Sequence, residues 1–240
     1  MINSHNFSLD KKDIDTILVL DFGSQYTQLI ARRIRELNVF SIILPWDCSV
    51  EKIAEINPKG VILSGGPQSV TKSNTPRVPE IIFELNVPVL GICYGMQTLA
   101  EQFGGQVSSS KNKEFGHAQI LLEKSSLLFD GLSPGSLIDV WMSHGDNVST
   151  LPDEFNLIAS TSSSPIAAME HVLKPIYALQ FHPEVTHTKK GNVILENFSF
   201  NICKCKAQWK IENLIEQRML DIKEKVGDQK VLLGLSGGVD

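Results

Sequence analysis

PVLGICYGMQTLAEQF, from Pro88 to Phe103, decides the fold because it predicts a buried strand, a sharp turn and a helix in immediate succession. Val87 to Ile92 is a short apolar run of the kind found in buried strands, and Tyr94 to Gly104 places apolar residues at helical spacing. Cys93 stands at the corner, with a glycine two residues away on either side. This G-x-nucleophile-x-G pattern is typical of a strand-turn-helix elbow that exposes a reactive side chain, and the helix N-terminus favours thiolate over thiol. The alternative is a buried structural cysteine beside a tight turn.

The segments that precede this stretch predict alternating strands and helices. Thr16 to Asp21 is apolar almost throughout, as expected for a strand covered on both faces. Strand and helix alternation indicates βαβ units with right-handed crossovers, and therefore a mostly parallel sheet. The predicted strands are 16–21, 39–44 and 60–63, and the predicted helices are 25–37 and 50–56.

After Gly105 the pattern changes to shorter strands with more alternation between apolar and polar residues, which predicts antiparallel hairpins. The fold class we expect is α/β, with an open, mostly parallel central sheet flanked by helices and a smaller antiparallel sheet. An amphipathic helix is expected over Lys190 to Cys203. The expected antiparallel strands are 118–122, 137–142, 157–160, 167–170 and 176–181.

A glycine turn, Ser64 to Pro67, follows the predicted strand that ends at Leu63. Open α/β sheets bind ligands at the carboxyl ends of their strands, and the neighbouring strand in this topology is the one that leads to Cys93. The backbone N–H groups of Gly66 and Tyr94 would then be two donors to an oxyanion. The alternative is an ordinary surface loop.

His182 differs from the other histidines because Glu184 follows it by two residues. Residues two apart in an extended segment point the same way, so Glu184 can hold the imidazole in one tautomer while the other ring nitrogen faces Cys93. The alternative is a His-Pro-Glu segment that only caps a turn. His117, His171 and His187 show no obvious acidic or cysteine partner in the sequence.

Composition excludes several classes of protein. The 240 residues carry a formal net charge of −5 with dispersed signs, which argues against nucleic-acid binding by bulk electrostatics. No apolar run reaches the roughly 18 to 20 residues of a membrane span. Residues 1–14 are polar, so we expect a disordered lead without a signal peptide.

The four cysteines are spread along the chain without a disulfide framework, which fits a reducing, cytoplasmic setting. Cys203 and Cys205 have no second Cys/His pair at suitable spacing, and a structural zinc site usually needs four ligands. We therefore expect no metal site. The remaining two cysteines are Cys48 and Cys93.

Three motifs together resemble the class I (triad) glutamine amidotransferases. They are Ser64 to Pro67, Gly91 to Gln97 and Phe181 to Glu184, in this order and at this spacing. The resemblance covers about residues 15 to 240. Three further segments resemble the branch of the family that aminates XMP to GMP: 21–25 (DFGSQ), 141–146 (WMSHGD) and 182–188 (HPEVTHT).

The resemblance implies a role for each matching residue. Cys93 would attack the side-chain amide of glutamine, His182 would transfer the proton that leaves with ammonia, and Glu184 would orient His182. Gly66 and Tyr94 would supply the oxyanion hole through their backbone N–H groups. The glutamine α-amino and α-carboxylate groups would be held by Gln97 and by a loop that contains Ser143, His144, Gly145 and Asp146.

The C-terminal residues resemble the opening of the ATP loop of pyrophosphatase-type synthetases, S-G-G-x-D-S, which grips pyrophosphate through backbone N–H groups. A helix over 208–225 and a strand over 230–235 are expected before it. The chain then divides into a lead (1–14), an amidotransferase domain (15–206) and a linker helix with the truncated start of a synthetase domain (207–240). The matching positions are Ser236, Gly237, Gly238 and Asp240.

This resemblance implies no cofactor for the present chain. In the intact protein it implies ATP and Mg²⁺, with ATP and XMP bound only through the missing synthetase domain, and a homodimer. Two alternatives stay open. One is an amidotransferase of another pathway, such as anthranilate, carbamoyl phosphate or CTP synthesis, against which the ATP loop argues. The other is a regulatory module with an inactive triad, against which the presence of all three triad residue types argues.

Overall fold

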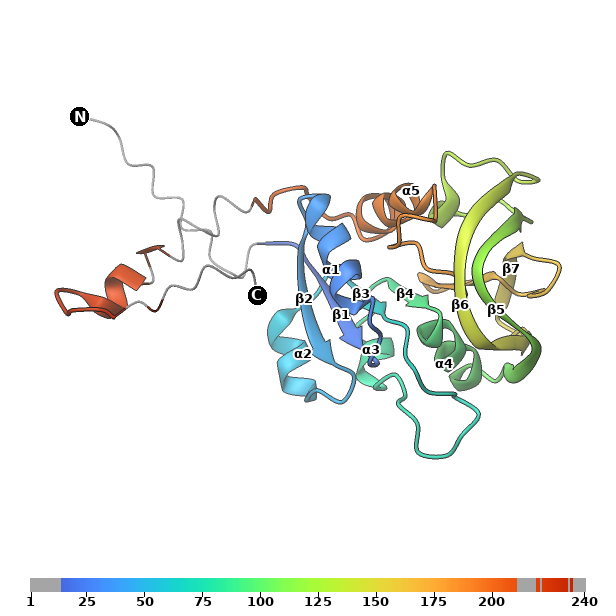
Figure 1. Cartoon of the computed structure of the whole chain (residues 1–240), viewed down its shortest axis with the longest axis horizontal. Helices are drawn as coiled ribbons and strands as arrows, with labels where there is room; N and C mark the ends of the chain where they lie inside the picture. The colour runs from blue at the N-terminus through green and yellow to red at the C-terminus, as the bar shows by residue number, and fades with distance from the viewer. Residues whose placement is uncertain (1–13, 211–218, 221, 233, 235–240) are drawn as a thin grey trace. The chain divides into compact units, whose positions relative to one another are not determined.

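Among the residues that this computed structural model describes (14–210, 219–220, 222–232 and 234), nine strands form one sheet in the order β2-β1-β3-β4-β9-β8-β7-β5-β6. Figure 1 shows β1 to β4 in one half of this sheet and β5, β6 and β7 in the other. Residues 1–13, most of the expected lead, lie outside the described residues. The strands are β1 (Thr16–Asp21), β2 (Phe40–Pro45), β3 (Gly60–Leu63), β4 (Val89–Ile92), β5 (Gln106–Leu122), β6 (Leu137–Thr150), β7 (Phe155–Ser160), β8 (Ala168–His171) and β9 (Ile176–Leu179).

Along the chain, helices α1, α2 and α3 alternate with strands β1 to β4, as the sequence pattern predicts. In the described part of the chain, no helix combines the length and the apolar character that crossing a membrane requires. The helical elements are α1 (Thr27–Glu36), α2 (Val50–Ile56), α3 (Ile81–Glu84), α4 (Tyr94–Gln102), a 3₁₀ turn η1 (Leu127–Phe129), α5 (Gly191–Glu196) and a π-helical segment η2 (Asn197–Ile202).

The parallel half of the sheet consists of β2, β1, β3, β4 and β9. Every residue of β3, β4 and β9 is buried, which explains their continuous apolar sequences. Strands β8, β7, β5 and β6 then continue the same sheet in antiparallel fashion. The predicted α/β class is confirmed, and its antiparallel part is hydrogen-bonded directly onto the parallel part.

The elbow between β4 and α4 has the sharp geometry that its glycines predict. Cys93 has φ +53° and ψ −103°, a backbone conformation that L-residues rarely adopt. A Cβ atom on Gly95 would lie 2.5 Å from the carbonyl oxygen of Leu63, and one on Gly91 would lie 2.7 Å from the carbonyl oxygen of Gly95. Only glycine at these positions lets α4 start this close to β3 and β4.

We expect Gly95→Ala to lower the free energy of unfolding by about 1 to 3 kcal/mol, the usual cost of overpacking a rigid core. The added methyl group would meet the backbone of Leu63, which cannot rotate away. Urea denaturation followed by circular dichroism measures the change. A variant as stable as the wild type would show that the elbow can open without cost.

Two strands are longer than predicted. β5 begins at Gln106 and β6 continues to Thr150, because their backbones pair over polar residues that show no apolar alternation. The expected loop over Ser143 to Asp146 was therefore wrong, since these residues lie inside β6. The register shifts between Ser109 and Glu114, opposite this segment of β6.

Strand β9, expected over 176–181 among the antiparallel strands, is shorter than predicted and pairs in parallel with β4 as well as antiparallel with β8. β9 ends at Leu179, so His182 and Glu184 lie on a turn after the strand and not in an extended segment. The backbone N–H of His182 donates to the carbonyl of Trp141 on β6 (3.0 Å), and Pro183 has no N–H to donate to a ladder.

The chain divides into two compact units between Gln208 and Trp209. Within the second unit, residues 219–220 and 222–226 are helical, which agrees with the helix predicted over 208–225 except for one further residue at its end. The strand predicted over 230–235 was wrong for the described residues 230–232 and 234, which have no regular structure. A strand needs a neighbour for its backbone hydrogen bonds, which a sequence pattern does not guarantee. The predicted ATP-loop residues Ser236, Gly237, Gly238 and Asp240 lie outside the described residues, and the domain assignment stays a prediction.

Candidate active site

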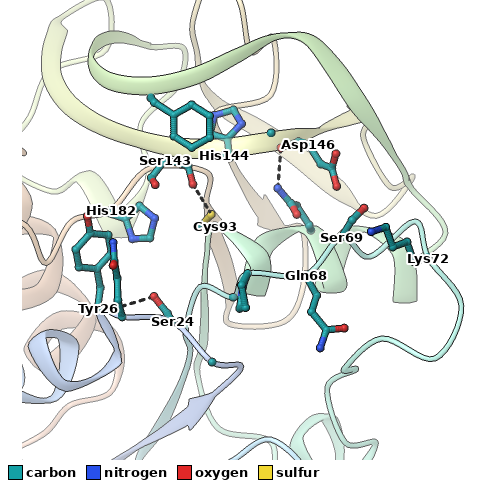
Figure 2. A pocket seen from close by; sticks show the side chains of 17 residues that line it. Ser24, Tyr26, Gln68, Ser69, Lys72, Cys93, Ser143, His144, Asp146 and His182 are labelled. Carbon is teal, nitrogen blue, oxygen red and sulfur yellow. Dashed lines mark hydrogen bonds between the residues drawn. The ribbon is translucent and has the colours of Figure 1, made fainter.

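A pocket of about 480 Å³ lies where β1, β3 and β4 end, at the carboxyl edge of the parallel strands (Figure 2). This is the edge at which open α/β sheets bind ligands. Cys93 and His182 both line the pocket, although 89 positions separate them in the sequence. Gly66, Gln97 and residues 143–146 line it as well, so most of the predicted site residues come together here.

Cys93 is 5% exposed and is held on two sides. Its backbone N–H donates to the carbonyl of Leu179 on β9 (2.7 Å), and its Sγ lies 3.6 Å from the carbonyl oxygen of Ser143 on β6. All four cysteines are unpaired. Among them Cys93 lines the pocket, at the N-cap position directly before α4.

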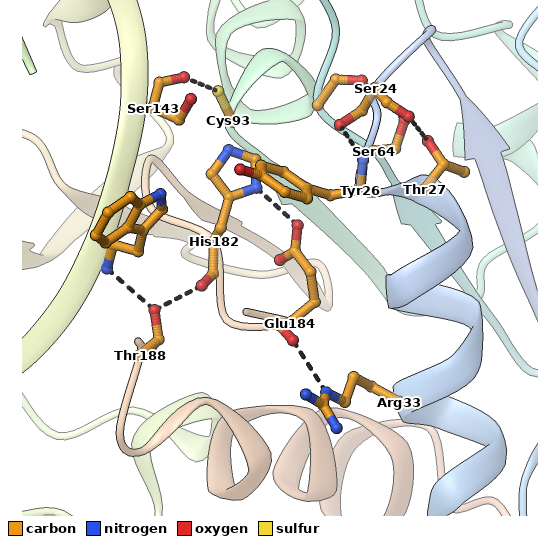
Figure 3. A network of polar contacts seen from close by, with 12 residues as sticks. Ser24, Tyr26, Thr27, Arg33, Ser64, Cys93, Ser143, His182, Glu184 and Thr188 are labelled. Carbon is orange, nitrogen blue, oxygen red and sulfur yellow. Dashed lines mark hydrogen bonds and ion pairs between the residues drawn. The ribbon is translucent and has the colours of Figure 1, made fainter. Parts of the chain in front are cut away.

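His182 and Glu184 form a buried pair, with Nδ1 of the imidazole 2.7 Å from Oε1 of the carboxylate (Figure 3). The two residues are 2% and 1% exposed. Burial alone would lower the pKa of His182, but the Glu184 carboxylate and the Cys93 side chain together raise this pKa well above its ordinary value. The pair therefore favours the imidazolium form next to the pocket.

Tyr26 is a pocket residue that the sequence reasoning missed. Its ring meets the ring of His182 edge-on, with centroids 5.0 Å apart. Gly65 closes in from another side, since a Cβ atom there would lie 3.2 Å from Cε1 of His182. The sequence signal for Tyr26 is its position directly after the segment 21–25, in the connection between β1 and α1.

The two predicted oxyanion residues are Gly66, which lines the pocket, and Tyr94, which directly follows Cys93 in the chain. A Cβ atom on Gly66 would lie 2.7 Å from the carbonyl oxygen of Phe22. Tyr94 is buried, and its hydroxyl donates to the carbonyl of Pro76 (2.7 Å), so only its backbone is left to serve Cys93. The oxyanion role of both N–H groups stays a prediction.

The side chain of Gln97 bonds to the protein itself. Its Nε2 donates to the carbonyl of Asp146 (2.7 Å) and lies 3.4 Å from Oε1 of Gln180. Gln97 thus ties α4 to the β6 segment that also contacts Cys93. Gly145 and Asp146 line the same wall of the pocket. Their role in holding glutamine stays a prediction.

His144 belongs to a second buried His–carboxylate pair. Its Nε2 lies 3.0 Å from Oε2 of Glu114, the residue directly opposite on β5. Burial lowers the pKa of His144 and outweighs the opposing effect of Glu114. Glu114 also contacts the hydroxyl of Ser163. Nothing in the sequence pattern pointed to Glu114, because the register of β5 on β6 brings it there.

Two histidines that were expected to lack acidic partners have them. His117 lies 2.9 Å from Asp139, and His171 lies 3.4 Å from Glu154. The partners are 22 and 17 positions away in the sequence, so the expectation was wrong because it searched only nearby residues. Neither histidine lines the pocket that contains Cys93.

A family model described as glutamine amidotransferase class-I matches residues 18–202. The chain is 57% identical over 230 residues to the glutamine-hydrolyzing GMP synthase of Teredinibacter turnerae, covering 93% of this chain and 44% of that protein. It is 52% identical over 245 residues to the corresponding protein of Haemophilus influenzae strain 86-028NP, covering 100% and 45%. The chain therefore spans less than half the length of these curated relatives.

Solved structures show the same fold. A protein from Thermoplasma acidophilum, described as a putative GMP synthase subunit, is 33% identical with a TM-score of 0.68, covering 85% of this chain and 98% of that one. A glutamine amidotransferase from Thermotoga maritima is 21% identical with a TM-score of 0.58, covering 88% and 92%. The second likeness concerns the fold alone.

Proposed function

Because the chain belongs to the class I glutamine amidotransferase family, we propose that it hydrolyses glutamine to glutamate and ammonia at Cys93. The observation that carries this proposal is the convergence of Cys93 and the His182–Glu184 pair at one pocket. A nucleophile, a base and a residue that orients the base are the three groups that acyl transfer through a thioester needs.

In the first half of the reaction, the Cys93 thiolate attacks the side-chain carbonyl carbon of glutamine. The oxyanion that forms would accept hydrogen bonds from the N–H groups of Gly66 and Tyr94. His182, whose raised pKa favours the imidazolium, gives a proton to the amide nitrogen. The C–N bond then breaks, and ammonia leaves behind a γ-glutamyl thioester on Cys93.

In the second half, His182 takes a proton from a water molecule, which attacks the thioester carbonyl. The C–S bond breaks, glutamate leaves, and Cys93 regains its thiolate with His182 protonated. Glu184 holds one tautomer of His182 through both halves. Gln97 and residues Ser143, His144, Gly145 and Asp146 would form the wall that holds the α-amino and α-carboxylate groups of glutamine, partly through backbone atoms.

We further propose that the whole protein uses this ammonia to aminate XMP to GMP, with ATP and Mg²⁺ bound by a synthetase domain and with a homodimeric assembly. The identity to GMP synthases over nearly the whole chain supports this proposal over amidotransferases of other pathways. A cytoplasmic setting is supported by four unpaired cysteines. The predicted contacts with ATP fall on Ser236, Gly237, Gly238 and Asp240.

The test of the proposed function combines turnover with labelling. The chain should release glutamate from glutamine, and a diazoketone or chloroketone analogue of glutamine should alkylate Cys93 and spare Cys48, Cys203 and Cys205. Cys203 and Cys205 are buried away from the pocket, and burial raises the pKa of Cys48. Peptide mapping by mass spectrometry locates the adduct. An adduct on another cysteine, or no glutamate release, would overturn the assignment.

A further inference from the structure

The turn that carries His182 and Glu184 belongs to no strand or helix. β9 ends at Leu179 and α5 begins at Gly191, so no regular ladder of backbone hydrogen bonds fixes the turn. Even so, the two side chains are held 2.7 Å apart in a buried site. Other contacts must therefore set the position of this backbone (Figure 3).

Thr188 supplies the first of these contacts. Its hydroxyl donates to the carbonyl of His182 (2.6 Å) and accepts from the backbone N–H of Trp141 on β6 (3.0 Å). The N–H of His182 donates to the carbonyl of Trp141 (3.0 Å), so both backbone groups of His182 are tied to one residue of β6. Thr188 is 4% exposed, so removing its hydroxyl would leave two buried backbone groups without their hydrogen-bond partner.

The link to β6 matters because the same strand contacts the nucleophile. Ser143, two residues after Trp141, places its carbonyl oxygen 3.6 Å from Sγ of Cys93. Because the strand repeats every two residues, the backbone groups of Trp141 and Ser143 point toward the same edge of β6. One strand therefore serves as the common reference for the positions of Cys93 and His182.

Arg33 supplies the second contact, from the other side of the turn. Its Nε donates to the carbonyl of Glu184 (3.0 Å), across 151 positions of sequence. Its side chain is 20% exposed, and its Nη1 also pairs with Oε2 of Glu36 (2.7 Å). Glu36 thereby holds the guanidinium in place on α1 while Nε reaches the turn.

We propose that Thr188 and Arg33 are positioning residues, which fix the backbone of the His182–Glu184 turn relative to Cys93. This inference rests on the proposed glutamine hydrolysis. Neither residue touches the substrate pocket, and each acts through one carbonyl group of the turn. Small displacements of reacting groups cost large factors in rate, so the contacts should appear in kcat and not in glutamine binding.

The first test replaces Thr188 by valine, which keeps the shape of the side chain and removes the hydroxyl. We expect kcat for glutamine to fall about 10-fold with KM nearly unchanged, and Thr188→Ser to restore most of the activity. As His182 moves away from Glu184, its raised pKa should fall. The alkaline limb of the pH–activity profile should then shift to lower pH in Thr188→Val and stay in place in Thr188→Ser.

The second test uses two neighbouring arginines that both pair with Glu36. Arg32 is 73% exposed and its Nε bonds to Glu36, whereas Arg33 also reaches Glu184. We expect Arg33→Met to lower kcat by about 3- to 10-fold and Arg32→Met to leave it unchanged. A difference between these variants isolates the carbonyl contact from the loss of one charge on α1.

The outcomes separate the inference from the proposed function. Wild-type kcat and pH profile in Thr188→Val, equal damage in Thr188→Ser, or equal effects of the two arginine variants would overturn the positioning role. Absence of glutamate release from the wild-type chain would overturn the proposed function instead. In that case the alkylation of Cys93 by iodoacetamide provides a readout that needs no glutamine. Its pH dependence reports the interaction of Cys93 with His182, and it can be compared between Thr188→Val and Thr188→Ser. Thermal unfolding of each variant shows that the chain remains folded.

Discussion

Cys93→Ala is expected to abolish glutamine hydrolysis while leaving the fold intact. The substitution removes the only atom that can form the γ-glutamyl thioester, and in triad hydrolases loss of the nucleophile costs on the order of 10⁶ in kcat. The small alanine side chain fits where the Cys93 side chain is now 5% exposed beside the carbonyl of Ser143. Glutamate release measured with a coupled dehydrogenase assay gives the rate.

The matched control for this variant is Cys48→Ala. Cys48 is a half-buried, unpaired cysteine that does not line the pocket, so its replacement should leave the rate unchanged. Should Cys93→Ala retain measurable turnover above the Cys93-blocked wild type, the reaction would have to proceed without a thioester, and the proposed mechanism would be wrong.

Glu184→Gln is expected to slow turnover by about 10- to 1,000-fold. The neutral amide can still accept the hydrogen bond from His182 but cannot stabilise the imidazolium. A thiolate nucleophile needs less help from a base than a serine hydroxyl, so the loss should be smaller than the roughly 10,000-fold loss of the Ser-His-Asp template. Steady-state kcat values for the two proteins measure the effect.

The same variant should change the pH dependence in a defined direction. Glu184 is the main group that raises the pKa of His182 against the effect of burial. Without its charge this pKa falls, so the imidazolium that protonates the leaving ammonia is lost at lower pH. The alkaline limb of the profile should therefore move to lower pH.

A His–carboxylate contact outside the pocket, between His171 and Glu154, provides the control. His171 lies 3.4 Å from Glu154, away from the pocket, so Glu154→Gln should change neither the rate nor the pH profile. Wild-type turnover in Glu184→Gln would remove Glu184 from the mechanism.

Features coded by adjacent residues could be predicted from the sequence. The elbow around Cys93 was predicted because Gly91 and Gly95 stand at fixed distances from the nucleophile, and the structure shows which backbone atoms they make room for. Strands β1 to β4 were predicted as parallel because strands alternate with helices there and a strand buried on both faces has a continuous apolar sequence, whereas β9 was wrongly expected among the antiparallel strands. The His182–Glu184 pair was predicted from its spacing, although a turn and not a strand brings the two together.

Features coded by strand register could not be predicted. Ser143 lies on β6 and not in a loop because the pairing of β5 with β6 continues over polar residues. The contact of Glu114 with His144 depends on that register, and the bond from Arg33 to Glu184 joins residues 151 positions apart. Such contacts follow from tertiary packing, which leaves no periodic signal in the sequence.

The link between Trp141 and the catalytic turn also bears on aggregation. β6 is the last strand of the sheet, and the outer backbone groups of such a strand are a template onto which another chain can add a strand. At Trp141 the N–H is already bonded to Thr188 and the carbonyl to His182. The turn that orients His182 thus also covers part of the outer edge of β6. A chain in which this turn is displaced would hydrolyse glutamine more slowly and would also be prone to self-association.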